Sequence, residues 1–70
     1  MMPLNLADIG EPQIIKKIGG SPDVKKHLED MGFTVGERVS VITELGGNII
    51  VKVKESRVAL SAELARRIMI

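Results

Sequence analysis

The stretch Ser21–Gly36, SPDVKKHLEDMGFTVG, contains the start and stop signals of one helix and the turn that follows it. Ser21 can accept a hydrogen bond from a free backbone N–H of the first helical turn. Pro22 follows at the first helical position, where its missing N–H costs nothing. Apolar residues then recur at i, i+4 and i+7 and form one stripe, which comprises Val24, Leu28 and Met31.

The end of this helix is also marked in the sequence. Gly32 can adopt the left-handed conformation that ends a helix, and Phe33 just beyond it can fold back onto Leu28. Gly36 supplies a second position for a positive φ, as in a tight turn over residues 34–37. We therefore expect the chain to enter a strand directly after this turn, and the helix to plug or cover the strands of the remaining chain.

The rest of the chain is typical of short strands joined by turns. Segments that are β-branched or alternate between apolar and polar residues cover residues 13–18, 37–45, 49–54, 57–60 and 68–70. Ser61 can cap a brief helical turn, and we expect Leu4 and Leu6 to pack across the base of the core. This order predicts a mainly β fold with one inserted helix, a small, partly open barrel that forms a single domain over residues 1–70.

The two longest strands predict a hairpin. Alternation gives each strand one core-facing set, Val39, Val41, Thr43 and Leu45 in the first and Ile49, Val51 and Val53 in the second. A three-residue loop, Gly46-Gly47-Asn48, keeps the two sets together and pairs Val41 with Val53. A two-residue loop would pair Val41 with Lys52 and mix core with surface. We therefore predict the longer loop, with Gly47 or Asn48 at a positive φ.

The composition limits the classes of function. Ten basic and nine acidic residues give a formal net charge of +1, which offers no electrostatic case for binding nucleic acid or an acidic membrane. The absence of cysteine excludes disulfides, thiolate metal sites and cysteine nucleophiles. With one Phe and no Trp or Tyr, the chain lacks the aromatic platform on which small barrels stack bases. No apolar run could cross a bilayer, so we expect a cytoplasmic protein without direct membrane insertion.

One helix face offers an alternative metal site. Asp23, His27 and Asp30 recur at i, i+4 and i+7, and two carboxylates around an imidazole could bind a divalent first-row metal. We prefer a solvated polar stripe, because acidic residues beside a surface histidine are common on amphipathic helices. No catalytic constellation accompanies this histidine, so we expect neither an enzyme nor a bound cofactor.

Two isoleucines lie on the polar-facing sides of the hairpin strands. Either the helix or the N-terminal segment covers Ile42 and Ile50, or they are exposed and mark a partner site. We favour coverage, because small barrels bend enough to bury residues from both faces. If the two side chains are exposed, Phe33 at the helix exit joins Ile42 and Ile50 as a candidate partner interface.

Residues 28–36, LEDMGFTVG, resemble the signature of the FeoA family of small ferrous iron transport proteins. The residues that match the signature are Leu28, Asp30, Met31, Gly32 and Gly36. The resemblance continues in order through Gly46-Gly47, Ala59-Leu60 and Ala65-x-x-Ile68-x-Ile70. Val35 stands where proline is usual and Phe33 where leucine is frequent, and both preserve the turn and its packing.

The resemblance implies an SH3-like β-barrel and a non-enzymatic accessory role in ferrous iron transport. In that role the protein would bind the cytoplasmic domain of a FeoB-like membrane transporter of Fe(II). The resemblance brings no catalytic residues and no proline-peptide groove. Two alternatives stay open: a transition-metal sensor or carrier that uses Asp23, His27 and Asp30, and, less favoured, a small barrel that binds nucleic acid.

Overall fold

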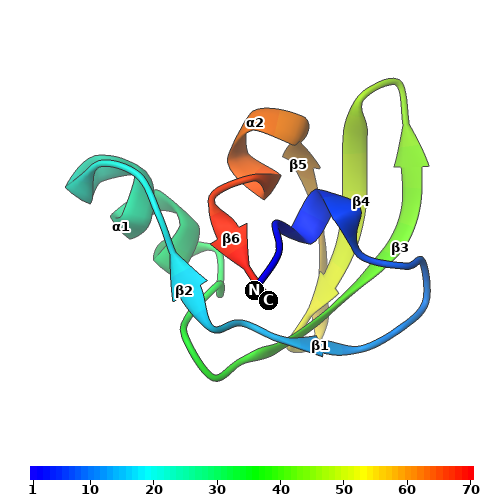
Figure 1. The fold of residues 1–70 in the computed structure, drawn as a ribbon, viewed down its shortest axis with the longest axis horizontal. Helices are drawn as coiled ribbons and strands as arrows, with labels where there is room; N and C mark the ends of the chain where they lie inside the picture. Colours follow the sequence, from blue (N-terminus) through cyan, green and yellow to red (C-terminus); the bar gives the residue numbers. More distant parts are fainter.

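The computed structural model describes residues 1–70 and contains two antiparallel sheets and three short helices (Figure 1). The elements in chain order are η1 (Leu4–Leu6, a 3-10 helix), β1 (Gln13–Ile14), β2 (Lys17–Ile18), α1 (Pro22–Asp30), β3 (Arg38–Leu45), β4 (Asn48–Val53), β5 (Ser56–Ser61), α2 (Ala62–Ala65) and β6 (Ile68–Met69). The larger sheet has the strand order β1-β3-β4-β5, and β2 pairs with β6 in the smaller one.

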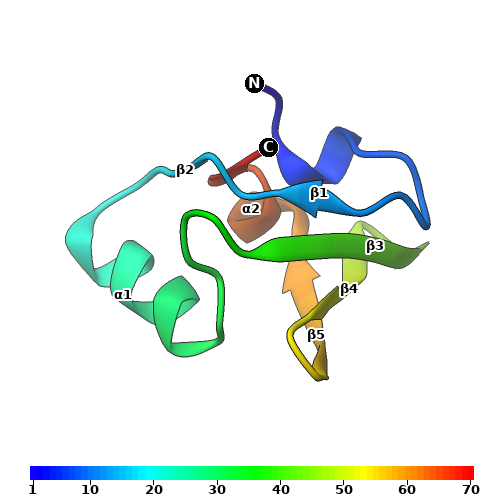
Figure 2. The same cartoon turned by 90° about the horizontal axis from the view of Figure 1, so that it is seen from below.

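The strand predicted over residues 13–18 is divided between the two sheets. Its first part, β1, pairs with β3 (Figure 2), and its second part, β2, pairs with β6 (Figure 1). The chain ends extend the smaller sheet, because the Met2 amide donates to the Ile70 carbonyl over 2.9 Å and the Ile70 amide donates back over 2.8 Å. The sheets do not close into a continuous barrel. The prediction of a mainly β, partly open fold with an inserted helix is therefore confirmed.

Helix α1 begins and ends where its local signals predicted. The Ser21 hydroxyl accepts a hydrogen bond from the Val24 amide over 3.3 Å. At the other end Gly32 has a φ of 102°. The Phe33 amide donates to the Leu28 carbonyl over 3.0 Å, as in a Schellman cap. The Glu37 amide then donates to the Thr34 carbonyl over 3.0 Å, which confirms the predicted tight turn.

The position of α1 differs from the expectation that it covers the strands. The helix lies at one end of the molecule, beside the sheets (Figures 1 and 2). Leu28 is its one buried residue, with Val24 and Met31 half-buried against the core. A nine-residue helix with one narrow apolar stripe offers too little apolar surface to cover two sheets.

The core is filled instead by the inner sheet face and by the two other helices. Leu4 of η1 and Ala65 of α2 are fully buried, and α2 packs against η1, β4 and β5. Leu6 is 63% exposed, so the expectation that it packs beside Leu4 is wrong. A 3-10 helix has three residues per turn, so side chains two positions apart point in different directions. Every buried residue of the chain is apolar.

The register of the β3–β4 hairpin also differs from the prediction. Gly46 and Gly47 alone form the loop, with φ values of 58° and 86°, as a type I′ turn requires. Leu45 therefore pairs with Asn48. A β-bulge between Val41 and Thr43 then shifts the ladder, so that Val41 lies opposite Val51 rather than Val53. The positive φ at Gly47 is confirmed, and the three-residue loop is wrong.

The bulge explains how a short loop and a clean core coexist. Without it, the two-residue loop would bring Val41 opposite Lys52 and mix core with surface. Ile42 is the extra residue that corrects this mismatch. The core-facing alternation of β3 ends there, and Leu45 is 74% exposed. The buried positions of the two strands are at most 3% exposed, namely Val39, Val41, Ile49, Val51 and Val53.

Candidate interaction surface

The three side chains of the alternative metal site do not come together as one. Asp23, His27 and Asp30 are exposed on α1, and no three His, Asp or Glu side chains of the chain gather in a group that could hold a metal ion. The Asp30 carboxylate lies 3.8 Å from the Lys26 ammonium instead. Asp23 lies in the first helical turn, where the helix dipole favours negative charge. These positions fit a solvated polar stripe.

The signature residues mainly shape the end of α1. Leu28 anchors the helix in the core, Met31 is its C-cap, and Gly32 reverses the chain. Gly36 has a φ of 92° at the tight turn, and Asp30 is the exposed last residue of the helix. Each of these positions therefore has a structural explanation.

The predicted partner interface of Phe33, Ile42 and Ile50 is not assembled on the surface. Phe33 is 0% exposed, because the helix cap turns its ring into the core, so it has no surface to offer a partner. Ile42 and Ile50 are half-buried, neither fully covered nor freely exposed. Ile50 lies between Thr43 and Ala59 of the neighbouring strands. Phe33 is therefore withdrawn as an interface residue.

Other apolar side chains are exposed that were not predicted as interface residues. They come from five different segments and are Leu6, Ile9, Ile14, Val35 and Leu45, besides the two N-terminal methionines. Single exposed apolar side chains are common on small proteins. None of them marks a site by itself.

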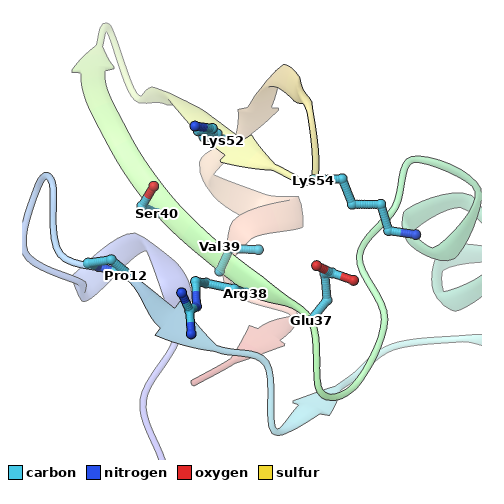
Figure 3. Close-up of a pocket in the computed structure, with 7 residues that line it drawn as sticks. All are labelled: Pro12, Glu37, Arg38, Val39, Ser40, Lys52 and Lys54. Atoms are coloured by element: carbon cyan, nitrogen blue, oxygen red, sulfur yellow. The ribbon is translucent and has the colours of Figure 1, made fainter.

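The outer side of β3 and β4 is hollowed and carries positive charge. A pocket of about 280 Å³ opens there, lined by Pro12, Glu37, Arg38, Val39, Ser40, Lys52 and Lys54 (Figure 3). Arg38 and Ser40 flank the buried Val39 on β3, and strand alternation directs them to the outer side. Lys52 alternates in the same way with the buried valines of β4. Three of the seven lining residues are cations.

The sheet register brings a fourth cation to this side. Ser40 pairs with Lys52, and Lys52 pairs with Arg57 of β5, so the three residues form one row across three strands. None of these cations has a carboxylate within 4 Å, because the one ion pair of the chain joins Lys26 and Asp30. We call Arg38, Lys52, Lys54 and Arg57 the basic face.

Charge is therefore segregated in this molecule. The four exposed cations of the basic face have two acidic residues near them, Glu37 in the pocket lining and Glu55 in the turn after Lys54. The rest of the chain holds six basic and seven acidic residues. A net charge of +1 conceals this arrangement. The outer side of the sheet is thus suited to anionic groups.

Comparisons with known proteins agree on one family. The FeoA domain profile matches residues 2–70. A protein of Methanocaldococcus jannaschii, provisionally named Fe(2+) transport protein A, is 36% identical over 70 residues, which are 100% of this chain and 85% of that protein. An iron uptake regulatory protein, FeoA, whose crystal structure is known, is 34% identical in sequence to this chain. The two structures superpose over 97% of this chain and 90% of that protein, with a TM-score of 0.87.

A more distant structure supports the type of fold. FeoA of Stenotrophomonas maltophilia, complexed with zinc and described as a prokaryotic SH3 domain protein, is 23% identical to this chain. It covers 99% of this chain and 88% of its own with a TM-score of 0.84, which confirms the predicted SH3-like architecture. Neither α-helix of the present chain is long and apolar enough to span a membrane. From the profile match and the relatives together, this chain belongs to the FeoA family, which is associated with ferrous iron transport.

Proposed function

We propose that this protein is a non-enzymatic, cytoplasmic accessory protein of ferrous iron transport that binds the cytoplasmic domain of a FeoB-like Fe(II) transporter. The observation that carries the proposal is the FeoA domain match over residues 2–70, which leaves nearly the whole chain within one iron-transport family. The S. maltophilia relative is described as a candidate activating factor of ferrous iron transport, which supports an accessory role.

The geometry supports a protein that acts by presenting a surface. Its single histidine, His27, is exposed on α1, and its buried residues are all apolar. The basic face with its hollow is suited to contact with a protein of opposite charge. In this proposal Fe(II) is the cargo of the transporter, and this chain acts on the transporter through contact.

Nucleic acid is the disfavoured partner in this proposal. Stacking of bases needs exposed aromatic side chains, and the one aromatic residue, Phe33, is buried. The basic face could attract phosphates by charge alone, which would give weak and strongly salt-dependent binding.

A pull-down tests the proposal directly. The purified protein is incubated with the tagged cytoplasmic domain of the FeoB-like transporter from the same organism, with and without Fe(II). We expect retention in both conditions. Failure to bind in either condition would contradict the proposal. Retention that requires Fe(II) and is lost in His27→Ala would favour the metal-sensor alternative instead.

A further inference from the structure

We infer that the basic face, Arg38, Lys52, Lys54 and Arg57, is a docking site for an acidic, extended polypeptide segment with Asp or Glu at every second position. The inference deepens the proposed function by giving the contact a chemistry. It rests on that function only for the identity of the protein that carries the segment.

The first step of the argument is the uncompensated charge of this face. Lys52 and Arg57 lie directly opposite each other on β4 and β5, and like charges in such pairs destabilise a sheet. All four cations are exposed, and none has a carboxylate within 4 Å. The free protein thus keeps together charges that repel one another. An anionic partner would relieve this repulsion.

The second step is the spacing of the cations. Arg38 on β3 forms one row, and Ser40, two residues further along that strand, begins the second row with Lys52 and Arg57. Lys54 lies in the turn after β4, with a φ of 55°, and adds its charge outside this spacing. Two residues of a strand span roughly 6.6–6.8 Å. Alternate side chains of any extended segment have this same spacing and point to one side. Carboxylates at i and i+2 can therefore meet both rows of cations at once.

The third step separates a polypeptide from other anionic ligands. Glu37 lies in the pocket lining beside the cations, where it would repel any anionic group, phosphate or carboxylate, that has no hydrogen-bond donor to offer it (Figure 3). A polypeptide also carries backbone N–H groups, which can donate hydrogen bonds to the Glu37 carboxylate. Ser40 adds a hydroxyl, in the same row as Lys52 and Arg57, that can accept or donate a hydrogen bond. The mixed chemistry of the pocket therefore favours an acidic peptide.

A binding experiment with defined peptides tests the inference without the transporter. One fluorescein-labelled peptide alternates Glu and Thr, and the other carries the same number of Glu at every third position. Fluorescence anisotropy at low salt gives the two dissociation constants. We expect the alternating peptide to bind at least about threefold more tightly, because only its carboxylates match both rows.

Charge reversal locates the site. Lys52→Glu should lower the affinity for the alternating peptide by about tenfold, whereas Lys25→Glu should change this affinity by less than about twofold. Lys25 is the matched control, because it is exposed on α1 and its reversal changes the net charge equally.

Stability gives a readout that a folding defect would not mimic. Lys52→Glu creates an opposite-charge pair with Arg57, so its melting temperature should rise by roughly 1–5 °C while binding is lost. If Lys52→Glu unfolds, Arg57→Gln, which removes one charge of the same pair, takes its place in the binding assay.

Three outcomes would overturn the inference. The first is an equal loss of binding in Lys52→Glu and Lys25→Glu, and the second is equal affinity for the two peptides. The third is tighter binding of a single-stranded oligonucleotide, or of phosphatidylglycerol vesicles, than of the alternating peptide. If the transporter domain is retained in the pull-down but the peptide does not bind, this inference fails and the proposed function stands. If the peptide binds and the transporter domain is not retained, the proposed function fails and the inference of an acidic-peptide site stands.

Discussion

The two sides of the β3–β4–β5 sheet differ in burial and in the chemistry of their side chains. The inner side is apolar and at most 3% exposed at Val39, Val51, Val53 and Leu60. The outer side of the same strands carries Arg38, Lys52 and Arg57 of the basic face, and Lys54 lies in the turn between β4 and β5. Because successive side chains of a strand point to opposite sides, one set of strands supplies both the core and a charged surface. Stability and binding should therefore respond to different substitutions at neighbouring positions.

The largest expected effect comes from moving charge to the inner side. Val51→Lys should unfold the domain, because Val51 is 0% exposed and an unpaired buried charge costs several kcal/mol. A domain of this size has only about 3–5 kcal/mol to lose. The adjacent Lys52→Val should leave the fold intact. Circular dichroism gives the melting temperatures of both variants. A Val51→Lys variant that melts within a few degrees of the wild type would contradict the difference between the inner and outer sides.

An intermediate effect is expected at the half-buried isoleucines. Ile42→Glu and Ile50→Glu should each cost about 1–3 kcal/mol, less than Val51→Lys, because solvent still reaches these side chains. Urea denaturation gives the free energies of unfolding. Complete unfolding of either variant would show that its side chain belongs to the core.

The same two variants decide whether the isoleucines belong to an interface. A folded Ile42→Glu, Ile50→Glu double variant that is retained by the transporter domain and supports normal Fe(II) uptake would exclude them. A folded variant that loses both transporter binding and Fe(II) uptake would instead show that the contact extends beyond the basic face to these isoleucines.

A smaller effect is expected where the two sides meet, at the end of β4. Gly32 lies there with a φ of 102°, and an added Cβ would lie 3.8 Å from both Val53 and the Lys54 side chain, an ordinary contact. Gly32→Ala should therefore cost about 1–2 kcal/mol through backbone strain alone. Gly32→Val should cost at least as much, because β-branched residues resist a positive φ.

Gly36 provides the matched control for this effect. It has a φ of 92° and nothing within 4 Å of an added Cβ. If strain alone sets the cost, Gly36→Ala and Gly32→Ala should lower the melting temperature by similar amounts. A much larger loss at Gly32 would show that packing against Val53 matters, and no loss would show that the left-handed conformation is not required.

The sequence predicted α1 well because its signals are local. The Ser21 cap, the Gly32 reversal and the return of Phe33 each depend on residues within five positions of one another. The positions of the strands along the chain and the mainly β type of fold followed from equally local alternation and turn residues. The cap that returns Phe33 to Leu28 also predicts the burial of its ring, which conflicts with the prediction of Phe33 as an interface residue.

The hairpin register was not predictable in this way. In an unbroken ladder, a two-residue loop mixes core with surface. A bulge at Ile42 removes that conflict, and nothing in the alternation of residues 38–45 marks it. The pair of glycines was the available signal, because two adjacent positive φ values favour a type I′ turn.

The basic face was missed for a related reason. The sequence placed Arg38, Ser40, Lys52 and Lys54 on outward-facing positions, but the net charge of the whole chain argued against an electrostatic surface. The row of Ser40, Lys52 and Arg57 exists only once three strands are aligned in the observed register. The amino-acid composition cannot reveal a cluster that depends on the pairing register of the strands.

The most direct test of the central claim, that this protein binds its transporter through the outer side of the sheet, is an NMR titration. The ¹⁵N-labelled protein is titrated with the cytoplasmic domain of the FeoB-like transporter, and amide shifts are followed residue by residue. We predict that the shifts concentrate at Arg38, Ser40, Lys52, Lys54 and Arg57 and disappear in Lys52→Glu. Shifts confined to α1 with the basic face unchanged, or no shifts at all, would contradict the account.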